Sequence, residues 1–278
     1  MFGLLFAVAL STIAARVPAV TGVMAIDLIS GRTMALRADE RFPMGSVYKF
    51  PIALAVLREV DRGKLKLDTR YTIAVADFSA GVSPIRDRAK GKPITVTLRE
   101  LIAAMLGESD NTACDFLLKL VPPDAVTKYL RDIGVNDIDV NRSEKEIARD
   151  IHATTDGVAR YAKDRRDSAT PRGLAMLLQR FARGEADLSP ASQAFAMQAM
   201  IESPTSSKRI KGLLPKSAVV AHKTGTMPGT LNDVGIVTSA DGKLRFAIAI
   251  LTKESSESVE ARERVIAQIA SEVWNDWR

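Results

Sequence analysis

The sequence is poor in the residues on which several common kinds of active site depend. Among its 278 residues there is one cysteine, Cys114, which excludes a disulfide within the chain. Two histidines, His152 and His222, and no Cys/His cluster argue against a zinc site and leave little room for a Ser-His-Asp triad. A Gly-x-Ser-x-Gly motif and a P-loop are also absent, which removes the α/β-hydrolase and nucleotide-hydrolase interpretations. A serine nucleophile in this chain would need a base other than histidine.

The charge of the chain is modest and evenly spread. The net charge is +6, with 26% charged and 46% hydrophobic residues and no low-complexity tract, as in an ordinary globular protein. A small positive excess indicates either a well-solvated surface or attraction of an anionic substrate. Because no dense Lys/Arg block is interleaved with aromatic residues, we expect no nucleic acid partner.

The apolar N-terminal stretch, residues 1–16, has two interpretations. Its length and alanine content suit the remnant of an export signal, yet no basic residue precedes Arg16. The run is shorter than the ~20 residues that a transmembrane helix needs. The alternatives are therefore a signal remnant and a buried first helix.

Hydrophobic spacing predicts strands at both ends of the chain and helices between them. Residues 20–36 form two β-branched runs around a Ser-Gly pair, and residues 218–226 and 233–253 give strands with an Asp-Gly hairpin, followed by an amphipathic helix to Arg278. Helical spacing covers 48–65, 96–106 and 170–185, whereas 122–170 is weakly periodic with a loop-like centre.

These elements predict one catalytic domain of the α/β (α+β) class over residues 1–278. Strands from the two termini would pair in one antiparallel sheet flanked by helices, with an all-helical subdomain inserted between them. We expect the α/β part to cover approximately 17–45 and 205–278, and the helical part approximately 46–204. A cleft between the two parts would be the natural site.

Three short motifs carry chemistry that the rest of the chain does not explain. Ser46 and Lys49 stand three positions apart at the start of an apolar helix, so they share one face. Ser109-Asp110-Asn111 lies between two helices, and His222 to Thr226 places a glycine within a strand. Each alone is unremarkable, because serine also caps helices and Ser-Asp-Asn also forms turns.

Taken together and in this order, the motifs resemble those of the class A serine β-lactamases, within the penicillin-recognising serine hydrolases. Ser-x-x-Lys, Ser-Asp-Asn and Lys-Thr-Gly are the motif set of that superfamily. The resemblance extends to "ERFPMGSVYK", "SPI" at 83–85, "SDNTACDFLL", "RDSATP" at 166–171 and "RIKGLLP" at 209–215. It implies a β-lactamase/transpeptidase-like fold and hydrolysis of the β-lactam amide of penicillins and cephalosporins.

The resemblance also implies a role for each matching residue. Ser46 would be acylated, Lys49 would help to deprotonate it, and the backbone N–H groups of Ser46 and Thr226 would form the oxyanion hole. Ser109 would pass a proton to the departing ring nitrogen, with Lys223 setting the local field. The substrate would be bound by Asn111, Thr224, Gly225 and Thr226, and by Arg209, which would support the substrate carboxylate.

Deacylation is the step for which the match is least complete. "NRSEKEIARD" at 141–150 resembles the opening of the family's Ω-shaped loop, so Glu144 is the candidate base, with Arg142 and Asp167 closing the loop. The family has an asparagine four residues after the glutamate, which helps to hold the water, and this position is Ala148 here. The stretch from Glu144 to Asp167 is also roughly ten residues longer than usual. Glu146 is therefore a competing base.

Two other functions use the same nucleophile. One is a D-alanyl-D-alanine carboxypeptidase or transpeptidase, a penicillin-binding enzyme that lacks the loop glutamate; the other is a β-lactam sensor that deacylates slowly. For the β-lactamase we expect no metal, no cofactor and no obligate protein partner, a monomer, and small-molecule β-lactams as substrates. The sensor would instead need a membrane-linked partner. The resemblance places the protein in the periplasm or outside the cell.

Overall fold

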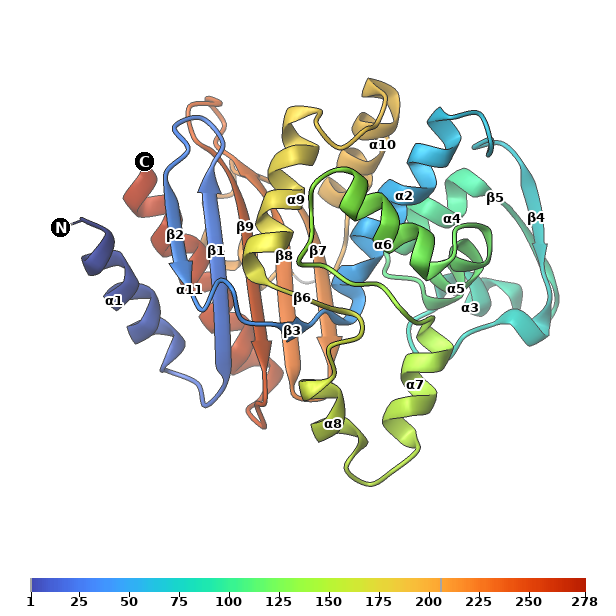
Figure 1. The fold of residues 1–278 in the computed structure, drawn as a ribbon, viewed down its shortest axis with the longest axis horizontal. Helices are drawn as coiled ribbons and strands as arrows, with labels where there is room; N and C mark the ends of the chain where they lie inside the picture. Colours follow the sequence, from blue (N-terminus) through green and yellow to red (C-terminus); the bar gives the residue numbers. More distant parts are fainter. Residues whose placement is uncertain (1, 206) are drawn as a thin grey trace.

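An antiparallel sheet joins the two ends of the chain in the computed structural model, which describes residues 2–205 and 207–278, with only the backbone course for 2–7. Its five strands run in the order β2-β1-β9-β8-β7 (Figure 1). They are β1 (Val20–Asp27), β2 (Thr33–Leu36), β7 (Val219–Met227), β8 (Thr230–Thr238) and β9 (Arg245–Lys253). The first strand pairs with the last along its whole length, from Val20 opposite Lys253 to Asp27 opposite Phe246. The predicted α/β architecture is confirmed.

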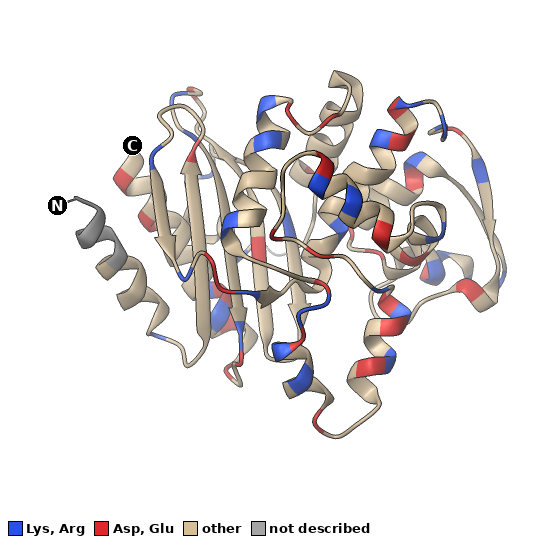
Figure 2. Cartoon of the chain, viewed as in Figure 1, with Lys and Arg blue, Asp and Glu red and all other residues tan. Residues whose placement is uncertain are grey.

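Both faces of this sheet are buried. Side chains alternate along a strand, so β9 directs Phe246, Ile248 and Ile250 to one face and its alanines, with Leu251, to the other. The face with large side chains is covered by α11 (Val259–Trp277), and the other face by α9 (Pro171–Arg183). Figure 2 shows that charged residues are concentrated on the helices and connections, whereas most of the sheet is uncharged.

The N-terminal stretch is a helix, α1 (Phe2–Ala14), which lies beside α11. Leu10 is fully buried there, and Ile13 is nearly so, in the same apolar cluster as α11. The described side chains of α1 therefore pack against α11 through one face, while Val8, Ser11 and Thr12 are exposed. Within the described residues no helix is both long and apolar enough to cross a bilayer.

The helical region is built around α2 (Lys49–Asp61), whose residues from Lys49 to Leu57 are all buried. A helix that is apolar on all sides must be surrounded by others. Its neighbours include α4 (Leu98–Gly107), α5 (Asn111–Leu120), α6 (Pro123–Asp132) and α10 (Pro190–Ile201). Shorter elements of the chain are β3 (Phe42–Pro43), η1 (Gly45–Tyr48), β4 (Arg70–Ile73), η2 (Val75–Asp77), α3 (Pro84–Ala89), β5 (Ile94–Thr97), β6 (Ser168–Ala169) and η3 (Ile210–Leu213), the last of which packs on α11.

The prediction for residues 122–170 was wrong in part. A loop does separate α6 from the next helix, but the segment also contains α7 (Glu144–His152) and α8 (Gly157–Lys163). The start of α7 is fixed by a capping box, in which Ser143 and Glu146 satisfy each other's backbone N–H groups. Such a cap stabilises a short, charged helix in which Ile147 and Ile151 are the buried residues, so its apolar stripe spans a single turn. We call residues 144–163 the two-helix extension.

Candidate active site

Ser46 lies where the sheet meets the helical region, in η1 immediately before α2. We call residues 43–46 the Ser46 turn. The buried Asn232 of β8 holds this turn, because its Nδ2 donates to the carbonyl oxygens of Pro43 (2.9 Å) and Met44 (3.0 Å). Gly45 has φ +51°, a left-handed conformation that glycine adopts without steric cost. Asn232 was not found from sequence, since an asparagine within a strand gives no signal of its partner.

Lys49 brings three of the predicted site residues together. Its ammonium is fully buried and donates to the carbonyl oxygen of Ser109 (2.7 Å) and to Oδ1 of Asn111 (2.6 Å). It also forms an ion pair with Glu144, with 2.9 Å between Nζ and Oε1. A buried ammonium needs such partners, because an unpaired charge in the interior is costly.

Ser109 bridges the two buried lysines of the site. Its carbonyl oxygen accepts from Lys49, and its Oγ accepts from Nζ of Lys223 at 3.0 Å. Ser109 has φ +62°, which is strained for a residue with a side chain. Lys223 also donates to the carbonyl oxygen of Thr224, and burial together with the positive charge of Lys49 holds the pKa of its ammonium well below the usual value.

The backbone of the edge strand β7 packs directly against the backbone of the Ser46 turn. A Cβ placed on Gly225 would be 2.5 Å from the carbonyl oxygen of Met44, so only glycine fits there. On the other side, a Cβ on Gly45 would be 3.5 Å from the backbone nitrogen of Thr226. The backbone N–H groups of residues 46 and 226 therefore belong to neighbouring segments of one site.

Arg209 is buried beneath β7, and its guanidinium donates hydrogen bonds to oxygen atoms of the protein itself. Nη1 donates to the carbonyl oxygens of Gly225 (3.2 Å) and Asn232 (2.9 Å), and Nη2 donates to Oγ1 of Thr226 at 2.7 Å. Its Nε contacts Glu263 at 3.2 Å. The arginine is thus not a solvated surface charge; it fixes the strand and orients the Thr226 hydroxyl.

The structure distinguishes the two candidate glutamates. The carboxylate of Glu146 accepts from the backbone N–H and the hydroxyl of Ser143, each at 2.8 Å, and so serves the capping box. Glu144 instead reaches Lys49. Its backbone N–H donates to Oδ1 of Asp115 at 2.6 Å, which holds the start of α7 against α5. This contact could not be predicted from the sequence, in which Asp115 is only an acidic residue within the apolar stretch 111–120.

The Ser-Asp-Asn motif is both a helix cap and part of the site. Asp110 caps α5 by accepting from the backbone N–H of Ala113 (2.8 Å), and it also accepts from that of Ile85 (2.7 Å). Asn111 presents its Oδ1 to Lys49 while its Nδ2 donates to the carbonyl oxygen of Ala80 at 2.8 Å. The turn interpretation and the functional one are therefore compatible.

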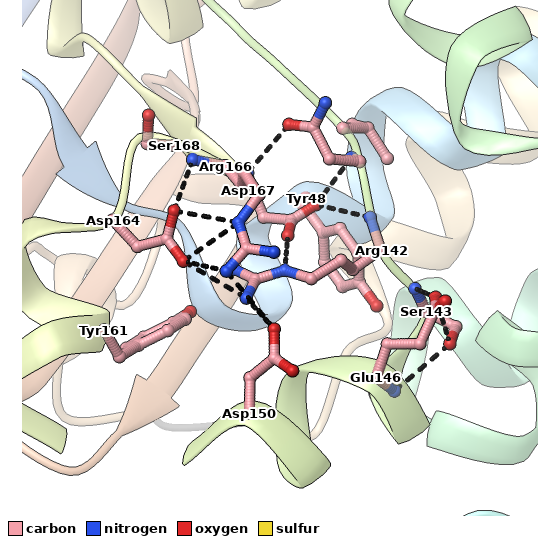
Figure 3. Close-up of polar contacts among 12 residues, drawn as sticks. Tyr48, Arg142, Ser143, Glu146, Asp150, Tyr161, Asp164, Arg166, Asp167 and Ser168 are labelled. Atoms are coloured by element: carbon pink, nitrogen blue, oxygen red, sulfur yellow. Dashed lines mark hydrogen bonds and ion pairs between the residues drawn. The ribbon is translucent and has the colours of Figure 1, made fainter. Parts of the chain in front are cut away.

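Arg142 is the centre of a charge cluster that closes the segment from 142 to 167 (Figure 3). Its Nε lies 2.7 Å from Oδ2 of Asp167, as predicted, and its Nη1 lies 2.7 Å from Asp150 and 3.2 Å from Asp164. Arg166 pairs with Asp150 and Asp164 from the outside. The two ends of the two-helix extension are thereby fastened to each other.

No metal site accompanies this arrangement among the residues described. No three His, Cys, Asp or Glu side chains there converge closely enough to hold a metal ion. His222 of β7 pairs with Asp233 of β8 through Nδ1, 2.9 Å from Oδ1, and both side chains are fully buried.

A serine beside a buried lysine, a second serine–lysine pair and a glutamate on a closed loop define a serine hydrolase of the penicillin-recognising type. Comparison with known proteins agrees. The sequence pattern of the "Beta-lactamase enzyme family" matches residues 5–277. The chain is 35% identical over 252 residues to β-lactamase VEB-1 of Pseudomonas aeruginosa, covering 87% of this chain and 80% of that protein.

Solved structures show the same likeness. A β-lactamase from Chitinophaga pinensis has a TM-score of 0.89 at 34% identity, over 98% of this chain and 99% of that one. A variant of the last common ancestor of Gram-negative bacteria class A β-lactamases has a TM-score of 0.87 at 34% identity, over 98% of both chains. The chain therefore belongs to the class A serine β-lactamase family.

Proposed function

We propose that this protein hydrolyses β-lactam antibiotics through an acyl-enzyme on Ser46. The observation that carries the proposal is the position of Lys49, whose buried ammonium joins Glu144, Ser109 and Asn111 one helical turn after Ser46. The Ser46 Oγ adds to the β-lactam carbonyl carbon while its proton passes to the Lys49–Glu144 pair. The ring C–N bond then breaks, and the nitrogen takes a proton through Ser109.

Three further sets of groups act on the substrate during acylation. The N–H groups of Ser46 and Thr226 donate to the carbonyl oxygen as it becomes negative, which stabilises the tetrahedral intermediate. The substrate carboxylate is bound by the hydroxyls of Thr224 and Thr226 and by the charge of Lys223. Asn111, whose amide is already fixed by Lys49 and Ala80, binds the amide side chain of the antibiotic.

Deacylation uses Glu144 as the base. Its carboxylate takes a proton from water, the water oxygen adds to the ester carbon, and the bond to Ser46 Oγ breaks as the serine recovers its proton. Glu144 is suited to this step because α7 is anchored at its first residue by Asp115, so the carboxylate is held in place. Penicillin-binding enzymes generally lack a glutamate on this loop, so the position of Glu144 favours the β-lactamase over the carboxypeptidase.

Replacing Arg209 with alanine is expected to raise KM for carboxylate-bearing β-lactams. The variant frees the Thr226 hydroxyl and leaves Glu263 without this partner, so both substrate binding and stability fall. Melting temperature should be measured beside KM, because the variant also loses the buried hydrogen bonds to the carbonyl oxygens of Gly225 and Asn232. An unchanged KM would show that the arginine does not support the substrate carboxylate.

The lowered pKa of Lys223 predicts an early alkaline limit to substrate binding. As pH rises through this lowered pKa, the ammonium loses its charge and its attraction for the substrate carboxylate. KM for benzylpenicillin should then rise at a pH below ~10.4, the value of a free lysine. In Lys223→Arg the charge persists, so the rise should move to higher pH. A flat KM up to the pH of free lysine would contradict this role.

The experiment that tests the proposal compares two substrates with the purified protein. Turnover of a chromogenic cephalosporin, without release of D-alanine from a D-alanyl-D-alanine peptide, supports the β-lactamase. Release of D-alanine with a slowly deacylating penicillin adduct would instead support the carboxypeptidase. The proposal includes a periplasmic or secreted location, because β-lactam antibiotics act on the cell wall outside the membrane. It also includes a monomeric state.

A further inference from the structure

The two-helix extension touches the Ser46 turn directly. Tyr161 of α8 is buried, with 4% of its surface exposed, and its hydroxyl oxygen accepts a hydrogen bond from the backbone N–H of Gly45 at 3.2 Å. Gly45 immediately precedes Ser46. Figure 3 shows Tyr161 beside the Arg142 cluster, which closes the extension.

The Ser46 turn is held from three directions. Asn232 of β8 holds the carbonyl oxygens of Pro43 and Met44. The backbone N–H of Met44 donates to the carbonyl oxygen of Asp167 at 3.1 Å, and Tyr161 takes the next N–H along the chain. Two of these three anchors belong to the segment that also carries Glu144.

The contact with Tyr161 matters because Gly45 is conformationally free. Its left-handed φ of +51° is one of several conformations open to glycine, so contacts with neighbouring segments must select it. The peptide plane that follows Gly45 carries the backbone N–H of Ser46. A buried N–H without an acceptor is unfavourable, so removal of the hydroxyl would favour a shift of this turn.

The Tyr161 hydroxyl stays protonated over the pH range at which the enzyme works. Burial raises the pKa of Tyr161, and the nearby charges of Glu144 and Asp167 raise it further. The phenol therefore stays neutral at any pH at which the enzyme works. The hydrogen bond to Gly45 does not depend on titration of the tyrosine.

We propose that Tyr161 is a positioning residue for the oxyanion hole: it fixes Gly45 and thereby the direction of the Ser46 N–H. The two-helix extension then serves both halves of the reaction, since it supplies Glu144 for deacylation and Tyr161 for acylation. This inference rests on the proposed function, because it assigns the Ser46 N–H to the oxyanion hole.

The test compares Tyr161→Phe with a matched control, Tyr129→Phe. Tyr129 is equally buried and donates to the carbonyl oxygen of Ala186 at 2.8 Å, and it lies outside the site described above. Tyr161→Phe is expected to lower kcat/KM, which reports acylation, by about 10- to 100-fold, because small displacements of reacting groups are costly. Tyr129→Phe should lower the melting temperature to a similar extent and leave kcat/KM unchanged. Equal kcat/KM in the two variants would overturn the proposal.

Hydrogen–deuterium exchange at the Gly45 N–H gives a readout that needs no turnover. Exchange there should be faster in Tyr161→Phe than in the wild type and unchanged in Tyr129→Phe. Unchanged exchange in Tyr161→Phe would contradict the contact itself. Failure of the proposed function would appear elsewhere, as a wild-type protein that forms no adduct with benzylpenicillin.

Discussion

Replacing Ser46 with alanine is expected to abolish covalent labelling by benzylpenicillin and to reduce β-lactam turnover by on the order of 10⁶-fold, as loss of a serine nucleophile does elsewhere. The reason is chemical, because alanine has no oxygen to form the ester. Ser46 is only partly buried, so the substitution should leave the melting temperature nearly unchanged.

The control for this variant is Ser217→Ala, at an exposed serine that precedes β7. Ser217→Ala should be labelled by benzylpenicillin and should turn over substrate as the wild type does. Both proteins can be mixed with excess benzylpenicillin and measured by intact-mass spectrometry. Labelling that persists in Ser46→Ala would place the nucleophile on another residue.

Replacing Glu144 with glutamine is expected to trap the acyl-enzyme. The amide cannot accept the proton of the attacking water, so deacylation should slow by about 10²–10⁴-fold, the usual contribution of a general base. Because Glu144 also pairs with Lys49, acylation should slow as well, but by less. The measurement is the lifetime of the penicilloyl adduct after excess antibiotic is removed.

Glu146→Gln is the matched control for this experiment. The capping box accepts glutamine as well as glutamate, so the start of α7 should be preserved. The carboxylate of Glu146 faces Ser143 and not Lys49, so deacylation should continue at the wild-type rate. An adduct trapped by Glu146→Gln and not by Glu144→Gln would exchange the roles of the two residues.

Much of the fold could be predicted because it depends on local spacing. β-Branched runs and the Asp-Gly turn at 241–242 predicted the hairpin of β8 and β9, and the terminal strands do pair. Ser46 in η1 and Lys49 at the first residue of α2 follow each other within one turn, as their separation of three residues predicts. The resemblance carried by the three motifs then indicated that Ser109 and Lys223 would lie close to Ser46 and Lys49, although the residues next to them in the sequence do not require this.

The rest depends on contacts between distant segments. Our proposal of Glu144 over Glu146 depends on the capping box, which engages Glu146, and on Asp115, which lies 29 residues from Glu144 and anchors its backbone N–H. The contact of Tyr161 with Gly45 spans 116 residues and comes from helices that the pattern of 122–170 did not reveal. Such contacts follow from tertiary packing, which a residue's type and spacing do not encode by themselves.

The measurement that tests the account most directly is an intact-mass time course of the wild-type protein with excess benzylpenicillin. We predict an adduct on Ser46 that appears and then disappears while penicilloate accumulates in solution. That result would support both proposed steps, acylation of Ser46 and deacylation with Glu144 as the base. An adduct that forms and persists would contradict the deacylation role of Glu144, and no adduct at all would contradict the central claim that Ser46 is the nucleophile.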